Sequence, residues 1–158
     1  MQLSVFISEL LRVNKMEKIN KLIRLHEGSK NKPYKCTAGK LTIGVGRNIE
    51  DLGISDEEID YLLTNDINRV RQELTNAFPW FSSLDDVRKD ALIDMCFNMG
   101  ITRLQGFQKA LTAMSEKNFT IASLEFLDSL WAAQVGQRAK TVTSMIKTGK
   151  YPDGFQQS

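Results

Sequence analysis

The segment that starts at Leu84 or Asp85 and runs to Gly100 has the spacing of a helix whose apolar residues lie on more than one face. Its apolar positions include Val87, Ala91, Leu92, Met95, Cys96 and Met99. A helix that is apolar on several faces must be surrounded by other elements, so we expect it to be the buried centre of a helical bundle. Gly100 follows it as the residue type that commonly ends a helix.

Other segments supply helices that could surround this one. Ser55-Asp56-Glu57-Glu58 has the pattern of a capping box, and apolar residues follow it at helical spacing until Pro79 stops the helix. Gly149 is expected to stop the last helix of the chain. Shorter helices are predicted over Gly106–Met114, Thr120–Ala133 and Gln137–Thr148.

The N-terminal part predicts one helix and one small β element. Asn14, with Glu17 three positions later, predicts the start of a helix that ends near Glu27. Pro33–Gly46 alternates apolar and polar residues around Ala38-Gly39-Lys40, which predicts a hairpin and its turn. The fold class is therefore α+β and mostly α, with a small N-terminal β-hairpin lobe and a larger helical lobe around a long buried central helix. We expect an extension over residues 1–15 and one domain over 16–158, with the β lobe at about 30–50.

Several classes of protein are excluded by what the chain lacks. Gln2–Val13 is apolar but short and has no basic start, so we expect an extra helix or a weakly ordered arm and not a secretory signal. No stretch approaches the ~20 apolar residues of a membrane span. Two cysteines are too few for a disulfide framework; we expect Cys96 to be a buried hydrophobe and Cys36 a reactive thiol. His26 is the single histidine and is expected at the surface, so we predict no metal site and no cofactor.

Charge is distributed unevenly along the N-terminal part. Residues 28–49 hold five cations and no carboxylate, whereas residues 50–66 hold seven carboxylates and no cation. A basic segment of this kind suits an anionic polymer, although solvated loop lysines would give the same pattern.

Glu27, Cys36 and Thr42 are separated by a short, turn-rich segment. If the helix ends at Glu27 and the hairpin folds back, the three side chains can face one cleft. An acid that protonates a leaving oxygen, a group that activates water and a hydroxyl that positions this water would suffice to hydrolyse a glycosidic bond. A single Glu at a helix end is more often a solvated carboxylate. Gly44 and Gly46 lack the third glycine of a dinucleotide loop, so they predict a sharp bend or a close approach.

The pattern Glu-x8-Cys-x5-Thr, with Tyr34 before the Cys and Gly-x-Gly after the Thr, resembles the catalytic triad of the phage-type lysozymes, the endolysins of T-even phages and their relatives. The resemblance extends over roughly Met16 to Tyr151. It includes the central helix, the pair Gly106-Phe107, Trp131, and the run Arg138-Ala139-Lys140. It implies a lysozyme-like fold and a muramidase that cuts the β-1,4 bond between N-acetylmuramic acid and N-acetylglucosamine in peptidoglycan.

Residue roles follow from the same resemblance. Glu27 is expected to be the general acid, and Thr42 is expected to hold the nucleophilic water. Phe97 matches an aromatic residue of the substrate cleft, although core packing is the more frequent role of such a side chain. Arg138 matches a cation near the catalytic Glu, but it could equally be a surface charge. Gly44 is expected to contact substrate. The expected partners are peptidoglycan glycan strands, with no nucleic acid, no stable membrane insertion and a monomeric chain.

This chain departs from the family pattern in three ways. Cys36 replaces the usual Asp, so it could act as a base, inverting the anomeric configuration, or as a nucleophile, retaining it. The segment after Gly46 is short, which implies a reduced β lobe and a more open cleft. Asn48, Ala110 and Glu125 stand where the family has polar sugar contacts, and we transfer no binding role to them.

Two alternative functions remain open from the sequence. A lytic transglycosylase would use Glu27 alone and release anhydro-muramyl products, and a non-catalytic module would only bind glycan. A phage endolysin, a tail-associated lysozyme and a prophage remnant would share this domain. We expect synthesis in the host cytoplasm and action on the cell wall in the periplasm after holin-type release.

Overall fold

The computed structural model describes residues 17–155, and the chain divides into two units, Met1–Ile59 and Asp60–Ser158. The predicted N-terminal extension and the predicted helix start at Asn14 lie outside the described residues. The fold is mostly helical with a small N-terminal antiparallel sheet, which confirms the predicted fold class. The described residues contain no helix that combines the length and the apolar character needed to cross a membrane.

The first unit holds a helix over residues 17–27 and a sheet of three antiparallel strands, ordered β1-β2-β3. The strands are β1 (Lys30–Lys35), β2 (Leu41–Gly44) and β3 (Arg47–Asn48). The turn between β1 and β2 falls at the predicted residues, and its Gly39 has φ +76°, a conformation that glycine adopts without steric cost. Pro33 lies in β1, an edge strand, where a residue without an N–H is tolerated. The predicted hairpin is confirmed, and β3 extends it.

Two helices follow the sheet. The short helix α2 (Ile49–Leu52) was not predicted from the sequence; the Asn48 side chain caps it by accepting a hydrogen bond from Asp51 N at 3.1 Å. The helix α3 (Asp56–Ala77) begins with the predicted capping box. Glu58 N donates to Ser55 Oγ at 3.3 Å, and Ser55 N donates to Glu58 Oε2 at 2.8 Å. These reciprocal bonds satisfy two backbone donors that the first turn of a helix leaves free.

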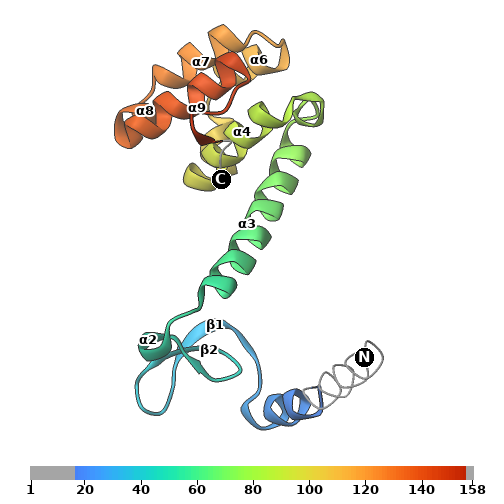
Figure 1. Ribbon diagram of the computed structural model, residues 1–158, viewed down its shortest axis with the longest axis vertical. Coiled ribbons are helices and arrows are strands. Elements are labelled where there is room, and N and C mark those ends of the chain that lie inside the picture. The colour runs from blue at the N-terminus through green and yellow to red at the C-terminus, as the bar shows by residue number, and fades with distance from the viewer. Residues whose placement is uncertain (1–16, 156–158) are drawn as a thin grey trace. The chain divides into compact units, whose positions relative to one another are not determined.

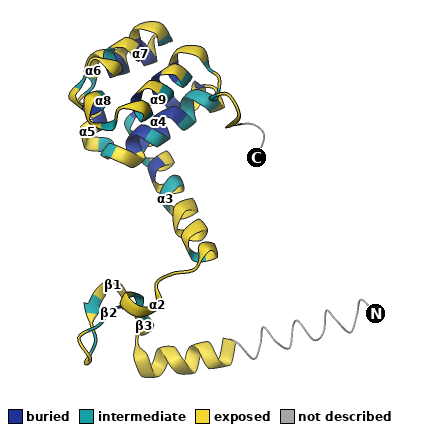
Figure 2. Ribbon diagram, turned by 60° about the vertical axis from the view of Figure 1, so that its left-hand side comes forward, coloured by how far each residue is buried: buried dark blue, intermediate teal, exposed yellow. Residues whose placement is uncertain are grey.

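The second unit is built around α4 (Asp86–Met99), whose residues Ala91, Leu92, Ile93, Met95 and Cys96 are buried. Asp85 caps its start and Gly100, with φ +81°, ends it, as the sequence predicted. Figure 1 shows α4 beside the helices α6 (Gln108–Ser115), α7 (Phe119–Leu127), α8 (Leu130–Val135) and α9 (Gln137–Thr148). The buried residues of this unit lie in α4 and also in the helices α6, α7 and α9 (Figure 2), so the predicted central helix is confirmed.

The prediction of one helix over Thr120–Ala133 is wrong, because the structure has two helices there. The helix is interrupted at Asp128 and Ser129. There the Ser129 hydroxyl accepts a hydrogen bond from Ala132 N at 3.1 Å and so caps the start of α8. A serine that caps a new helix interrupts the one before it. The sequence prediction also missed α5 (Ile101–Gln105), which follows Gly100 directly.

Candidate active site

Glu27 is the last residue of the helix over 17–27 and its side chain is exposed. Gly28 ends this helix with φ +72° and donates its N–H to Arg24 O at 2.9 Å. The carboxylate of Glu27 lies beside the loop that follows β2: its Oε2 is 3.6 Å from the position that a Cβ on Gly46 would occupy. Gly46 therefore leaves open space next to this carboxylate.

Cys36 lies at the start of the turn between β1 and β2 and is partly buried. Its backbone N–H donates to Lys40 O at 3.0 Å, and Gly39 N donates to Cys36 O at 2.8 Å. Hydrogen bonding from the backbone of Lys40 and Ala38 holds the pKa of the Cys36 thiol below its usual value. A lowered pKa increases the thiolate fraction near neutral pH, which fits the prediction of a reactive thiol.

Thr42 lies on the central strand β2, paired with Tyr34 on β1 and Asn48 on β3. Its side chain is buried, with 3% of its surface exposed, and its hydroxyl donates to Lys40 O at 3.0 Å. Cys36 N and the Thr42 hydroxyl thus bond to the same carbonyl oxygen, which ties the two residues together. Because the hydroxyl hydrogen is used in this bond, its oxygen lone pairs are free to accept from a water molecule.

The three predicted catalytic residues all belong to the first unit. Cys36 and Thr42 are brought together through Lys40, and Glu27 lies beside Gly46, two residues beyond the end of β2. Their assignment as a catalytic set stays a prediction. Gly44 ends β2 with φ +66°, and a Cβ there would meet no atom within 4 Å. The backbone conformation therefore explains this glycine, and its predicted contact with substrate stays a prediction.

Phe97 and Arg138 belong to the second unit. The interpretation of Phe97 as a core residue is wrong, because 45% of its surface is exposed at the last turn of α4. Arg138 donates from Nε to Asp94 Oδ1 at 2.9 Å and from Nη2 to Asp94 O at 3.3 Å. Asp94 and Phe97 are three residues apart on one helix, so they lie on neighbouring positions of one face.

Asp94 was not predicted as a site residue from the sequence. The signal was a carboxylate inside the otherwise apolar run from Ala91 to Phe97, which requires a partner or access to water. A second polar contact lies on the next turn of α4, where Trp131 Nε1 donates to Asn98 Oδ1 at 2.9 Å. Two polar residues of α4 thus hold residues of α8 and α9 in place.

The charge contrast between residues 28–49 and 50–66 is partly cancelled by ion pairs. Lys40 pairs with Asp51 at 2.8 Å, and Arg47 pairs with Glu58 at 2.8 Å. Lys30, Lys32 and Lys35 form no ion pair with any described residue, and the Lys30 ammonium lies over the Tyr34 ring, 4.2 Å from its centroid. The attraction for an anionic polymer that the sequence suggested therefore depends mainly on these three exposed lysines.

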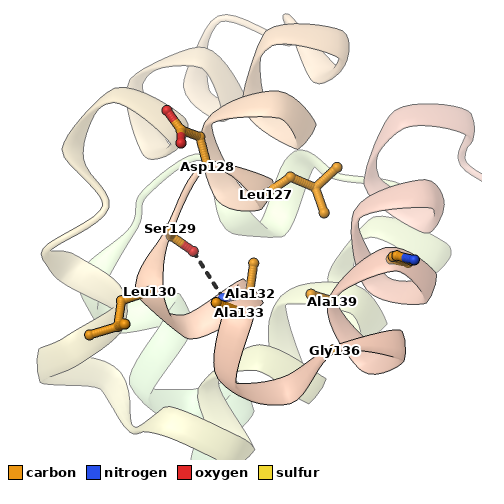
Figure 3. Close-up of a pocket in the computed structure, with 9 residues that line it drawn as sticks. Leu127, Asp128, Ser129, Leu130, Ala132, Ala133, Gly136 and Ala139 are labelled. Atoms are coloured by element: carbon orange, nitrogen blue, oxygen red, sulfur yellow. Dashed lines mark hydrogen bonds between the residues drawn. The ribbon is translucent and has the colours of Figure 1, made fainter.

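A pocket of about 550 Å³ lies in the second unit among α7, α8 and α9, and Figure 3 shows its lining. Its walls are largely Leu and Ala side chains, and the Ser129 hydroxyl is already bonded to Ala132 N. None of the predicted site residues lines it. Its lining therefore lacks the reactive groups of a catalytic site.

Comparison with known proteins gives a consistent picture. A family model described as phage lysozyme matches residues 24–147. "Probable T4-type lysozyme 1" of Dictyostelium discoideum is 28% identical, over 83% of this chain and 94% of its own length. An "Endolysin" of Acyrthosiphon pisum secondary endosymbiont phage 1 is 30% identical, over 80% of this chain and 86% of its own length. The "Pre-baseplate central spike protein Gp5" of Enterobacteria phage T4 is 29% identical over 81% of this chain, but over only 27% of its own length.

Proposed function

Because the chain belongs to the phage lysozyme family, we propose that it is a muramidase that hydrolyses the β-1,4 bond between N-acetylmuramic acid and N-acetylglucosamine in bacterial peptidoglycan. The observation that carries this proposal is the shared hydrogen bonding of Cys36 and Thr42 to Lys40 O, together with the Glu27 carboxylate beside Gly46 in the loop after β2. This arrangement supplies an ionisable thiol at the start of a hairpin turn and a buried hydroxyl on the strand that follows the turn.

The roles follow from the chemistry of each group. Glu27, in its protonated form, gives its proton to the glycosidic oxygen as the bond to the anomeric carbon breaks. The Cys36 thiolate takes a proton from water, whose oxygen bonds to the anomeric carbon and inverts its configuration. Thr42 accepts a hydrogen bond from this water and so positions it. Direct attack by sulfur would instead form a covalent glycosyl-enzyme that water then hydrolyses with net retention, so the anomeric configuration of the product decides between the two routes.

The same residues separate this function from its two alternatives. A lytic transglycosylase closes the muramyl 6-hydroxyl onto the anomeric carbon and would not need the Cys36 and Thr42 pair. A module that only binds glycan would not need a lowered pKa at Cys36. We infer that the glycan strands of peptidoglycan are the substrate of a monomeric chain, made in the host cytoplasm and released to the periplasmic wall by a holin-type route.

The test is lysis of outer-membrane-permeabilised Gram-negative cells by the purified chain. Glu27→Gln removes the proton donor, and we expect clearing to slow by at least about 100-fold, within the range that general acid–base catalysis contributes. The matched control is Glu17→Gln, the same change on an exposed residue of the same helix, which should leave clearing unchanged. Circular dichroism checks that all three proteins are folded.

The products decide between the enzymatic alternatives. Mass spectrometry of the digested wall should show muropeptides that have gained water. Anhydro-muramyl products would replace the muramidase with a transglycosylase. If the folded wild-type chain lyses no cells and releases no muropeptides, both enzymatic functions are excluded and the glycan-binding module is the function that is left.

A further inference from the structure

A second surface pocket lies on the outer face of α9, in the second unit. Its volume is about 460 Å³, within the range of small-ligand sites. Its lining comes from one face of α9 and from the chain that follows it: Gln137, Lys140, Thr141, Ser144, Met145, Thr148, Lys150, Tyr151, Pro152 and Asp153. The opposite face of α9, with Ala139, Val142 and Ile146, is buried in the core.

We propose that this pocket is a second binding site for peptidoglycan, which holds one muramyl-peptide unit of a glycan strand while the strand is cut elsewhere. The inference rests on the proposed function, because it takes the same polymer as ligand. None of the predicted catalytic residues belongs to it: Glu27, Cys36 and Thr42 are in the first unit, whereas residues 137–153 are in the second.

The polar part of the lining suits the hydroxyl groups of a sugar. Thr141, Ser144 and Thr148 follow each other at helical spacing, so their hydroxyls lie along one face of α9. Thr148 uses its hydroxyl locally, donating to Ser144 O at 2.8 Å and accepting from Lys150 N at 3.2 Å. The hydroxyls of Thr141 and Ser144 bond to no other described residue, so they can both donate to and accept from a ligand.

The apolar part of the lining suits the C–H face of a pyranose ring. Tyr151 stacks on Phe155, with ring centroids 5.3 Å apart. The Tyr151 hydroxyl donates to Asp90 Oδ2 at 2.6 Å, which fastens this segment to α4. The turn at Gly149, with φ +67°, directs the segment back so that Tyr151 and Pro152 form a wall of the pocket. A wall fixed in this way needs no reordering when a ligand binds.

Charge selects among saccharides. Lys140 and Lys150 line the pocket and take part in no ion pair between described residues, while Asp153 is the single carboxylate of the lining. Two free ammonium groups would bind carboxylates, such as those of muramyl lactyl groups and peptide stems. The lining contains no arginine fork of the kind that recognises phosphate. Hydroxyls, an aromatic wall and two lysines together favour a carboxylated glycan.

The experiment measures binding of the full chain to purified Gram-negative sacculi by sedimentation. All proteins carry Glu27→Gln, so that the sacculi stay intact. Ser144→Trp fills the pocket, and Lys140→Glu combined with Lys150→Glu reverses its charge. Each change should weaken binding about tenfold, the equivalent of one or two lost charge-assisted hydrogen bonds. The control combines Lys109→Glu with Lys147→Glu, two exposed lysines outside the pocket, and should bind as the parent does.

A second measurement keeps the two proposals separate. With Glu27 restored, the pocket variants should cleave short soluble muropeptides at the wild-type rate, because a short soluble fragment needs no second anchor on the chain. The second site would be overturned if Ser144→Trp left sacculus binding unchanged, or if the control variant weakened binding as much as the pocket variants do. Either result holds whether or not the chain is a muramidase. A wild type that cleaves nothing, but whose sacculus binding still depends on Ser144, would overturn the enzymatic function and keep the site.

Discussion

At the scale of single residues, the proposed role of Cys36 as the base makes the pKa of its thiol the quantity that should set the pH at which the site works. Backbone N–H groups of Lys40 and Ala38 bond to its sulfur and lower the pKa of the thiol. The thiolate is the form that accepts a proton or attacks carbon, so activity should rise as pH rises through this lowered pKa. Below it the thiol is protonated and the rate should fall.

Cys36→Asp tests this reasoning. An Asp has an ordinary pKa of about 3.9, so the acidic limb of the pH–rate profile should move several pH units downward. The measurement is the initial rate of wall lysis across pH, with Cys96→Ser as the control, because Cys96 is buried and its pKa is raised to about 11. An acidic limb at the same pH in wild type and Cys36→Asp would show that Cys36 does not act in its ionised form.

Single residues also show why part of the candidate site could be predicted from the sequence. Glu27, Cys36 and Thr42 lie within one helix-and-hairpin segment, so local turn signals were enough to bring Cys36 and Thr42 together in one hairpin. Asp94 and Arg138 are 44 positions apart and lie on different helices. Their pairing depends on how α4 and α9 pack, which no local pattern specifies.

At the scale of elements, helix ends were predicted where side chains cap them and missed where the cap was overlooked. Asp85 and Ser55 start helices at the predicted places because each accepts a bond from a backbone N–H of the first turn. Ser129 likewise accepts a bond from a backbone N–H in the first turn of α8. It lies, however, within an apolar run whose spacing predicts one continuous helix. The cap residue was visible in the sequence, but the hydrophobic spacing on both sides of it was the stronger pattern.

The capping box of α3 gives a prediction at this scale. Ser55→Ala removes the acceptor for Glu58 N and should destabilise the first turn by about 1 kcal/mol, which is about a fivefold faster amide exchange there. Glu58→Ala should have a larger effect, because Glu58 also receives two bonds from Arg47, at 2.8 and 3.0 Å. The measurement is hydrogen exchange of the amides of residues 56–60, with Ser115→Ala as a control on another helix. Equal exchange in Ser55→Ala and wild type would show that the cap contributes nothing.

At the scale of the whole second unit, Arg88 joins three helices that are distant in sequence. Its Nε donates to Ile146 O at 2.7 Å and its Nη2 to Lys147 O at 3.2 Å, so it satisfies carbonyls at the C-terminal end of α9. Its guanidinium also lies over the Phe119 ring at the start of α7, 3.7 Å from the centroid. The side chain is only 15% exposed. A link over 58 residues has no local signal, so the sequence could not predict it.

Arg88→Leu should therefore destabilise the second unit by about 2–4 kcal/mol, because it leaves two carbonyls and the Asp85 carboxylate without their charged donor. Arg88→Lys keeps the charge but not the planar guanidinium that reaches several partners at once. Its loss of unfolding free energy should therefore lie between that of wild type (none) and that of Arg88→Leu. The free energy of unfolding follows from denaturant titration of the fluorescence of Trp80 and Trp131, both in this unit. Arg69→Leu is the control: its bonds to Asp66 and Glu73 are exposed, and such pairs contribute about 0–1 kcal/mol. If Arg88→Leu and Arg69→Leu lower the free energy of unfolding by the same amount, α4 is held to α9 by apolar packing alone and the Arg88 guanidinium is not the link between them.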